Sequence, residues 1–461
     1  MYGLPEGQIG NSETGNINIG AGRIVCQEIT KINKSIEDGD FFSISEFNTA
    51  IENCKKNKSK LHIIGLVSDG GVHSHTRHLY ALLELAKRKG FEDVYIHCIL
   101  DGIDSSPASG ETYILELQKK IEEKGVGKIA SIMGRYYAMD REKNWDRIQK
   151  SYDALINGEG EKSISPISAI EKFYQQEIFD EFVKPTVITD SEGRPTGVIG
   201  QNDSVIFFNF RSDRAKELTR AIVDNEFKEF EKKLINLYFV SFTDFDEEIP
   251  NINVAFKKEI LNKTLGEYIS KKGLNQLRIA EEEKYSNVTY LFNCYNKKSY
   301  NNQDNIIIPS KKVETYDLKP EMSSIEITDA VIEAINEKKY DYIIVNYANV
   351  DIVGHTGNFE ATIKAIEVVD SCIERIVKAI NSVNGVLLFT SDHGNVEQMI
   401  DYKTGDPYTA HTTNQVPFII VGLDNIELKN GNLADVAPTI LSIMGIEKPK
   451  EMTGESLIIN K

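Results

Sequence analysis

The sequence predicts an α/β protein with largely parallel sheets and more than one domain. Apolar runs typical of strands alternate with helical patterns along most of the chain, which indicates parallel strand pairing. A chain of 461 residues is long enough for two or more domains with a large core. Hydrophobic residues make up 41% and charged residues 27% of the sequence, which excludes wholesale disorder.

The expected elements follow in chain order. In the first half we expect helices at 79–90, 111–125 and 215–224 and strands at 61–68, 94–100, 128–134, 204–210 and 235–243. In the last third we expect helices at 359–380 and 434–445 and strands at 342–347, 385–391 and 416–422. The polar stretch 294–305 predicts a surface loop. The joins near residues 26–30 and 255–262 are candidate domain boundaries.

Charge and cysteine usage narrow the class of protein. The formal net charge of −17 argues against nucleic acid and against an anionic membrane as partner. An anionic substrate would therefore have to be bound by a local basic pocket. No apolar stretch is long enough to span a bilayer, and the first residues show no secretory signal. Five scattered cysteines without CxxC spacing indicate reduced thiols, so we expect a cytoplasmic protein.

Potential metal ligands gather in three clusters near the C-terminal end. Asp351 and His355 follow the strand expected at 342–347, Asp392 and His393 follow the strand expected at 385–391, and His411 lies shortly after them. An isolated Asp–His dipeptide is usually a surface loop, and an isolated Asp-x-x-x-His is usually a solvated helix face. Three such clusters at strand ends and turns favour a site for Zn²⁺ or Mn²⁺.

A glycine-rich segment, residues 7–22, surrounds Ser12. Backbone amides freed by glycines can approach a phosphate, and a serine there could be a nucleophile or a phosphate acceptor. The alternative is a glycine-rich turn in which Ser12 or Asn11 caps a helix at 23–32. Taken alone, the segment favours this alternative.

Basic and polar residues follow the strands expected in the first half. His73 and His75 lie after the first of them, where we expect both to face a crevice, and the segment 101–110 follows the second. Arginines stand beside two further strands, at Arg135, Arg141, Arg211 and Arg214. A single arginine at such a place is more often solvated or ion-paired. Four of them favour a pocket for a small dianionic substrate, because guanidinium groups bind phosphate and carboxylate in a bidentate manner.

These segments carry a resemblance to a known family. GLPEGQIGNSETG, SDGGVHSH, MGRYYAMDR, FNFRSDR, QLRIAEEEKY, PEMSS, NYANVDIVGHTG, SDHGN, AHTTNQVPF and LADVAPTIL follow one another as in the cofactor-independent phosphoglycerate mutases of the alkaline phosphatase superfamily. The resemblance implies an alkaline-phosphatase-like metal domain of residues 1–26 and 261–461. A second α/β domain, the substrate-binding transferase domain of residues 27–260, would be inserted into it.

The implied activity is that of an isomerase of glycolysis, which interconverts 3-phosphoglycerate and 2-phosphoglycerate through a phosphoserine on Ser12. It needs two Mn²⁺ ions, with Zn²⁺ or Co²⁺ as alternatives, and no 2,3-bisphosphoglycerate. The family's pattern assigns Asp351, His355 and His411 to one metal ion, and Asp392, His393 and Ser12 to the other. It assigns substrate binding to His73, Asp104, Arg135, Arg141, Arg211, Arg214 and Lys284, with Asp104 or His73 as proton carrier. A monomer is implied.

The sequence departs from the family's pattern in four places. The family carries an upstream apolar strand that ends in a metal-binding aspartate, and the chain opens at MYGLPEG without either. Ile103 stands in place of a substrate-binding arginine, Asn16 in place of a histidine, and FNCYN (292–296) in place of a double glycine. A sheet without a central strand would expose two edges. A shortened or decayed copy with little activity, and a metal-dependent phosphatase of the same superfamily, therefore stay as alternatives.

Overall fold

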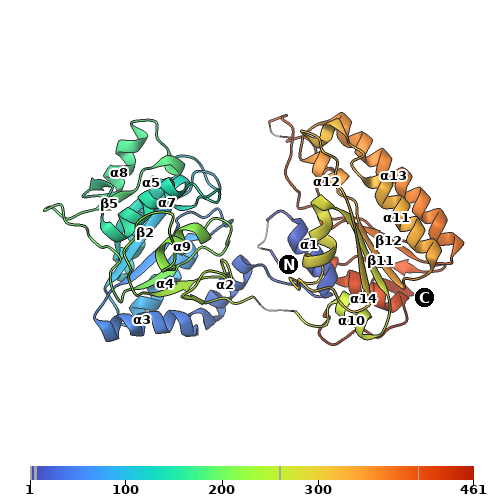
Figure 1. Ribbon diagram of the computed structural model, residues 1–461, viewed down its shortest axis with the longest axis horizontal. Helices are drawn as coiled ribbons and strands as arrows, with labels where there is room; N and C mark the ends of the chain where they lie inside the picture. Colours follow the sequence, from blue (N-terminus) through green and yellow to red (C-terminus); the bar gives the residue numbers. More distant parts are fainter. Residues whose placement is uncertain (1–2, 5–7, 259–260, 403, 461) are drawn as a thin grey trace. The chain divides into compact units, whose positions relative to one another are not determined.

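The computed structural model describes residues 3–4, 8–258, 261–402 and 404–460. The chain divides into two compact units (Figure 1). The terminal unit consists of Met1–Gln27 and Glu259–Lys461, and the central unit of Glu28–Lys258. The division falls beside the two expected joins, although residues 259 and 260 lie outside the described part. Among the described helices, none combines the length and the apolar character that are needed to cross a bilayer.

The central unit contains an eight-stranded sheet. Its strand order is β4(Glu161–Ser163)-β5(Thr186–Ile188)-β3(Lys128–Gly134)-β2(Val94–Leu100)-β1(Leu61–Leu66)-β6(Ser204–Phe207)-β7(Tyr238–Ser241)-β8(Ile252–Val254). Neighbouring strands are parallel except for β3 and β5, which are antiparallel. Strands β1 and β2 are buried along their whole length, as expected for parallel strands with helices on both faces. The five strands expected in this region are therefore confirmed, with β6 and β7 shorter than expected.

Helices cover both faces of this sheet. They are α2(Glu28–Asp38), α3(Ser45–Asn57), α4(Thr76–Arg88), α5(Gly110–Lys124), α6(Arg135–Ala138), α7(Trp145–Tyr152), α8(Pro166–Tyr174) and α9(Lys216–Val223). Successive residues of β1 belong to different cores: Ile63 packs with Leu79 of α4, whereas Ile64 packs with Leu218 of α9. This alternation follows from the two-residue period of a strand. The sheet is thus the middle layer of three.

The terminal unit contains two short sheets. One has the parallel order β10(Gln303–Ile308)-β9(Gln276–Glu281)-β11(Tyr342–Asn346), and the other pairs β12(Leu387–Thr390) with β13(Phe418–Val421) in antiparallel fashion. A small ribbon joins β14(Glu427–Leu428) to β15(Ile458–Asn460). The accompanying helices are α1(Ser12–Ala21), α10(Leu265–Lys271), α11(Ser324–Glu337), α12(Asn349–Gly354), α13(Phe359–Ser382) and α14(Val436–Ile443). The strands and helices expected in the last third are confirmed.

A cavity of about 1110 Å³ separates β11 from β12, and we call it the slot. Apolar side chains line it, among them Ile343 and Val345 of β11, Leu387 and Phe389 of β12, and Ile373 of α13. All residues of β11 and β12 are only half-buried, whereas β9 is buried along its whole length. Within the described residues, β11 pairs with β9 alone and β12 with β13 alone. Each of the two strands therefore has one edge without a strand partner among the described residues.

The glycine-rich segment forms helix α1 itself, so the expectation of a turn before a helix at 23–32 is wrong. Asn11 caps α1, because its side chain accepts a hydrogen bond from the backbone N–H of Thr14. Two glycines serve close packing. A Cβ on Gly15 would lie 2.1 Å from the carbonyl oxygen of Asp392, and a Cβ on Gly20 would lie 1.9 Å from that of Phe292. Gly15 thus brings α1 against the segment that carries Asp392 and His393, and Gly20 brings it against the segment that carries Phe292.

The segment FNCYN, where the family pattern has a double glycine, keeps the backbone of glycines. Cys294 has φ +50° and Tyr295 has φ +68°, so both lie in the left-handed region. This conformation costs a non-glycine residue about 1 kcal/mol or more. The contacts of Cys294 with the carbonyl of Ile17, and of Tyr295 with Glu13, hold the strained segment against α1. Both residues thus adopt a backbone conformation that favours glycine.

Candidate metal centre and anion pocket

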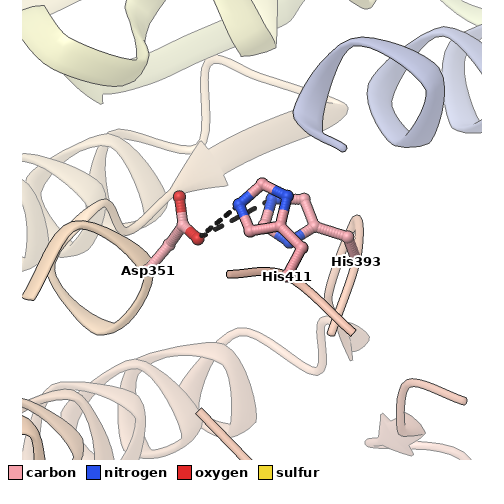
Figure 2. Close-up of side chains that lie close together, drawn as sticks. All are labelled: Asp351, His393 and His411. Atoms are coloured by element: carbon pink, nitrogen blue, oxygen red, sulfur yellow. Dashed lines mark ion pairs between the residues drawn. The ribbon is translucent and has the colours of Figure 1, made fainter. Parts of the chain in front are cut away.

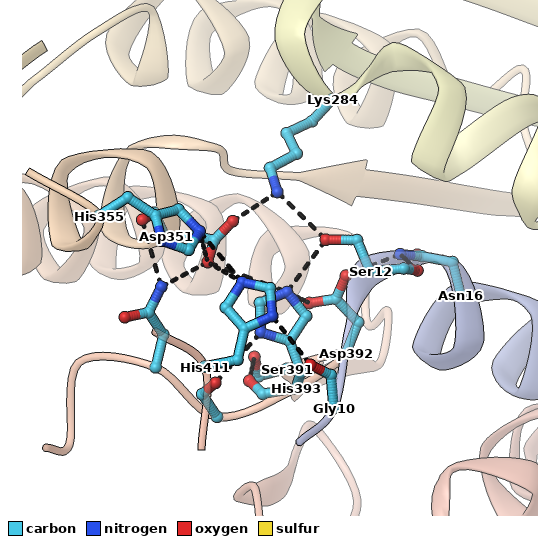
Figure 3. Close-up of polar contacts among 12 residues, drawn as sticks. Gly10, Ser12, Asn16, Lys284, Asp351, His355, Ser391, Asp392, His393 and His411 are labelled. Carbon is cyan, nitrogen blue, oxygen red and sulfur yellow. Dashed lines mark hydrogen bonds and ion pairs between the residues drawn. The ribbon is translucent and has the colours of Figure 1, made fainter. Parts of the chain in front are cut away.

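Ser12 stands at the first position of α1, facing a cluster of polar side chains (Figure 3). Its Oγ lies 3.0 Å from Nε2 of His393 and accepts a hydrogen bond of 3.2 Å from Nζ of Lys284. The unpaired backbone N–H groups of a helix start favour a phosphoryl group at this place. Since Lys284 is also buried, its charge acts on Ser12 with little screening by water.

Asp351 is the centre of the candidate metal ligands. Figure 2 shows its carboxylate facing the rings of His393 and His411. One ligand atom from each of these three residues lies within 4.8 Å of the others. Oδ1 of Asp351 is 3.3 Å from Nε2 of His411 and 3.4 Å from Nε2 of His355. One carboxylate and up to three imidazoles converge on one point, which is a donor set that suits Zn²⁺ or Mn²⁺.

The orientation of the histidine rings leaves their ligand nitrogens free for a cation. Nδ1 of His355 lies 2.7 Å from the carbonyl oxygen of Thr409. Nδ1 of His411 lies 2.8 Å from the carbonyl oxygen of Gly10. These contacts place the ring protons on Nδ1 and the lone pairs on Nε2, as second-shell contacts do in metal sites. The two Nε2 atoms are 3.0 Å apart. Two lone pairs at that distance repel each other unless a proton or a metal ion lies between them, so the donor set fits a bound cation.

The carboxylate of Asp351 is held ionised. Burial raises the pKa of Asp351, but contacts from His355, His411 and Lys284 lower it well below its ordinary value. The contact with Asp351 also raises the pKa of His355 above its usual value. Asp392 lies beside the cluster, with Oδ1 at 3.7 Å from Nε2 of His393. The amide of Asn16 donates a hydrogen bond of 2.7 Å to its Oδ2.

The structure therefore gathers all six predicted ligands and Lys284 into one region of the terminal unit. The ligands do not separate into two groups of three, because His393 lies close to Asp351 as well as to Asp392. Asn395 was missed by sequence reasoning. Its amide donates a hydrogen bond of 2.6 Å to Oδ1 of Asp351. Its position directly after SDHG could have indicated a supporting role.

The central unit places Arg135 and Asp104 together at the end of its sheet. Nη1 of Arg135, which is only 3% exposed, lies 2.7 Å from Oδ1 of Asp101 and 2.6 Å from Oδ2 of Asp104. Asp101 is buried as well and accepts a hydrogen bond of 2.6 Å from Ser68. Asp101 was missed by the sequence analysis, although it is the first polar residue after the strand at 94–100. Ile103 is 52% exposed and supplies no positive charge at this position.

The other predicted substrate residues lie around Asp213. His73 is buried. Its Nε2 lies 3.9 Å from Oδ2 of Asp104, and its Nδ1 lies 3.8 Å from Oδ1 of Asp213. Burial lowers the pKa of His73 to about 4, so its imidazole is neutral at pH 7. Arg141 and Arg211 form ion pairs with Asp213.

Two more of the residues noted in the sequence form hydrogen bonds with the backbone. Arg214 donates to the carbonyl of Met139. The expectation that His75 faces a crevice is wrong, because its ring caps α4 by accepting a hydrogen bond from Arg77 N–H.

Fold and site together define a two-unit α/β protein with a candidate metal centre and a separate cluster of arginines. Comparisons with known proteins agree. A family profile described as "BPG-independent PGAM N-terminus" matches residues 32–247. The 2,3-bisphosphoglycerate-independent phosphoglycerate mutase of Acetivibrio thermocellus is 58% identical over 99% of this chain and 90% of its own length. The enzyme of that name from Clostridium beijerinckii is 54% identical over 100% of this chain and 90% of its own length.

A solved structure also matches. The chain is similar to phosphoglycerate mutase of Leishmania mexicana, crystallised at low cobalt concentration, with a TM-score of 0.70 and 32% sequence identity. The match covers 100% of this chain and 89% of that one. The chain belongs to the family of 2,3-bisphosphoglycerate-independent phosphoglycerate mutases.

Proposed function

We propose that this chain interconverts 3-phosphoglycerate and 2-phosphoglycerate through a phosphoserine on Ser12, without 2,3-bisphosphoglycerate. The observation that carries the proposal is the placement of Ser12 at the start of α1, with Lys284 and His393 within hydrogen-bond distance. In this proposal the terminal unit is the alkaline-phosphatase-like metal domain. The central unit is the inserted substrate-binding domain.

The terminal unit would carry the phosphoryl group. Asp351, His355 and His411, and Asp392 with His393 and Ser12, would hold two metal ions, with Mn²⁺ as the ion we propose. Such ions, when bound, polarise phosphoryl oxygens and lower the pKa of a coordinated hydroxyl. Lys284 donates to Ser12 Oγ and would stabilise negative charge on that oxygen and on a phosphoryl group attached to it.

The central unit would hold the glycerate. Arg135, Arg141, Arg211 and Arg214 supply the cationic groups that bind its carboxylate, and the neutral imidazole of His73 can accept or donate a hydrogen bond. As the phosphoryl group leaves the hydroxyl oxygen on C3, that oxygen takes up a proton. The hydroxyl on C2 loses a proton when it attacks the phosphoserine. Asp104 is the group we propose to carry this proton, because its carboxylate is fixed by Arg135 and remains partly exposed.

The test is an enolase-coupled mutase assay on the full chain with Mn²⁺ and without 2,3-bisphosphoglycerate. Activity that disappears in Ser12→Ala and after EDTA treatment, together with a phosphoryl group on Ser12 found by mass spectrometry, would support the proposal. Release of inorganic phosphate without 2-phosphoglycerate would replace it by a metal-dependent phosphatase, which the loss of a cation at Ile103 favours. A correctly folded chain that is never labelled on Ser12 would refute both.

The location and oligomeric state are further parts of the proposal. All five cysteines are free, which is typical of a reducing compartment, and the reaction belongs to glycolysis. We therefore propose a cytoplasmic protein that acts on a small phosphoglycerate as a monomer.

A further inference from the structure

A carboxylate, Asp213, lies among the cationic groups of the central unit. Its Oδ1 is 3.0 Å from Nε of Arg211 and 3.8 Å from Nδ1 of His73, and its Oδ2 is 3.6 Å from Nη1 of Arg141. The side chain is 31% exposed, so it is neither a core residue nor a fully solvated one. One carboxylate thus contacts three of the residues that the proposed function assigns to the substrate.

Asp213 is the carboxylate that holds Arg141 and Arg211 in the described structure, since neither arginine has an ion pair with another residue there. Both arginine side chains are about half-exposed, with 49% and 51% of their surface accessible. Guanidinium groups repel one another when they share a pocket. Burial and the charges of Arg141 and Arg135 lower the pKa of nearby Arg214, which shows this repulsion. Without Asp213, nothing in the described structure would oppose it at Arg141 and Arg211.

The charges of the cluster nearly balance. Five arginines, with Arg147 among them, face the four carboxylates of Asp101, Asp104, Asp140 and Asp213, and His73 is neutral at pH 7. One positive charge is left over. This excess matches the single carboxylate of a glycerate whose phosphoryl group has been transferred. Loss of Asp213 would double the excess and favour anions of higher charge.

We propose that Asp213 is a specificity-determining residue, an internal counter-ion that limits the affinity of the arginine cluster for anions. This inference rests on the proposed function and deepens it. Asp213 keeps the guanidinium groups of Arg141 and Arg211 in place and partly neutralises them. The site then holds a glycerate firmly enough for the second transfer and still releases the product. It also disfavours a ligand with two phosphates, because the extra negative charge would lie close to the carboxylate of Asp213.

The test measures binding without turnover. In a Ser12→Ala background, 3-phosphoglycerate and 2,3-bisphosphoglycerate are titrated by calorimetry into the full chain with and without Asp213→Asn. We expect 3-phosphoglycerate to bind about tenfold more tightly to Asp213→Asn, which is the effect of one unit charge at about 6 Å in a half-exposed pocket. The affinity for 2,3-bisphosphoglycerate should rise by a larger factor. Asp213→Glu keeps the charge and should bind both ligands as the parent does.

Asp190→Asn is the matched control, because Asp190 pairs with Arg194 on the surface of the same unit, and it should leave both affinities unchanged. Unchanged or weaker binding in Asp213→Asn would overturn the inference. Asp213→Ser provides the same comparison if the asparagine variant does not fold.

Turnover supplies a second, independent readout. In the Ser12-containing chain, Asp213→Asn should lower both kcat and KM, because a tightly held product leaves slowly. A rise in KM at unchanged kcat would contradict the inference. If the parent chain shows no mutase activity, the proposed function fails, yet the difference in binding remains measurable. If the chain binds neither 3-phosphoglycerate nor 2,3-bisphosphoglycerate, inorganic sulfate is titrated instead. Asp213→Asn should then bind sulfate more tightly than the parent does.

Discussion

Replacing Arg135 with Met would leave the carboxylate of Asp101 buried without a cation. Asp101 is 1% exposed, and Arg135 Nη1 at 2.7 Å is its partner in an ion pair. The carboxylate also accepts hydrogen bonds from Ser68 and from the backbone N–H of Asp104. These bonds stay in the variant, but they do not neutralise the charge. The cost of the substitution is therefore the cost of an uncompensated buried charge.

Breaking a buried ion pair by removing one partner costs about 3–5 kcal/mol of unfolding free energy. For a unit the size of the central one, this corresponds to a fall in melting temperature of about 10 °C. The double variant Arg135→Met, Asp101→Asn removes both charges. We expect it to recover all but about 1–2 kcal/mol, because the amide oxygen can accept from the backbone N–H of Asp104, the amide NH2 can donate to Ser68 Oγ, and Met fills much of the arginine's volume.

Trp145 makes this measurement specific to the central unit. It is the single tryptophan of the chain, it stands at the start of α7, and its ring packs against that of Phe227 with centroids 5.2 Å apart. Urea unfolding followed by tryptophan fluorescence therefore reports on this unit. A single variant that unfolds at the same urea concentration as the parent, or a double variant less stable than the single one, would refute the reasoning.

The loss of stability in Arg135→Met should also depend on pH. Burial raises the pKa of Asp101, but Ser68, the backbone N–H of Asp104 and Arg135 lower it, and the net pKa lies below its ordinary value. A depressed pKa adds stability above the unfolded value of about 3.9, and this stability is lost as the pH falls through the folded value. Without Arg135, burial would raise the pKa of Asp101, so the difference between parent and Arg135→Met should be largest above that raised pKa and shrink as the pH falls towards the depressed pKa of the parent.

Two further predictions concern the terminal unit. Lys284→Gln removes the ammonium group 3.2 Å from Ser12 Oγ, and we expect phosphoserine formation, followed by mass spectrometry, to slow about 10²–10³-fold. Lys311→Gln, which breaks an ion pair with Glu326 in the same unit, is the control, and equal rates in both variants would contradict the role of Lys284. The half-exposed apolar lining of the slot should bind the dye ANS with an increase in fluorescence. Phe389→Glu should weaken that binding, and an unchanged dye titration would show that the dye does not enter the slot.

Much of the fold could be predicted because the strands of the central unit are buried on both faces. Continuous apolar runs such as 94–100 and 128–134 have the bounds of β2 and β3. The residues of the candidate metal centre could be predicted from residue type, because imidazoles and carboxylates followed expected strands. Helix α1 could not, since five glycines in one segment normally indicate a turn. Its glycines are explained only by the backbone of Asp392 and Phe292, which lie far away in the sequence.

The sequence also did not predict the carboxylates that pair with the arginines. Asp101 and Asp213 stand in segments noted in the sequence, but their significance depends on which guanidinium groups the fold brings beside them. Arg135 is 34 residues from Asp101 in the chain, so no local pattern connects them. Spacing identifies residues that one strand end presents together. It does not identify counter-ions recruited from a different strand.

The slot connects the architecture of the terminal unit to its chemistry. Asp351 follows β11 and His393 follows β12, and these two strands belong to different sheets that no described strand joins. One end of the slot is lined by Lys284, Asp351 and His393, so the separation of the sheets reaches the candidate metal centre. Among the described residues, no hydrogen-bond ladder links the strands that precede these two ligands. Metal ions bound at this end of the slot would link the ends of the two strands, and their binding energy would then also stabilise the fold.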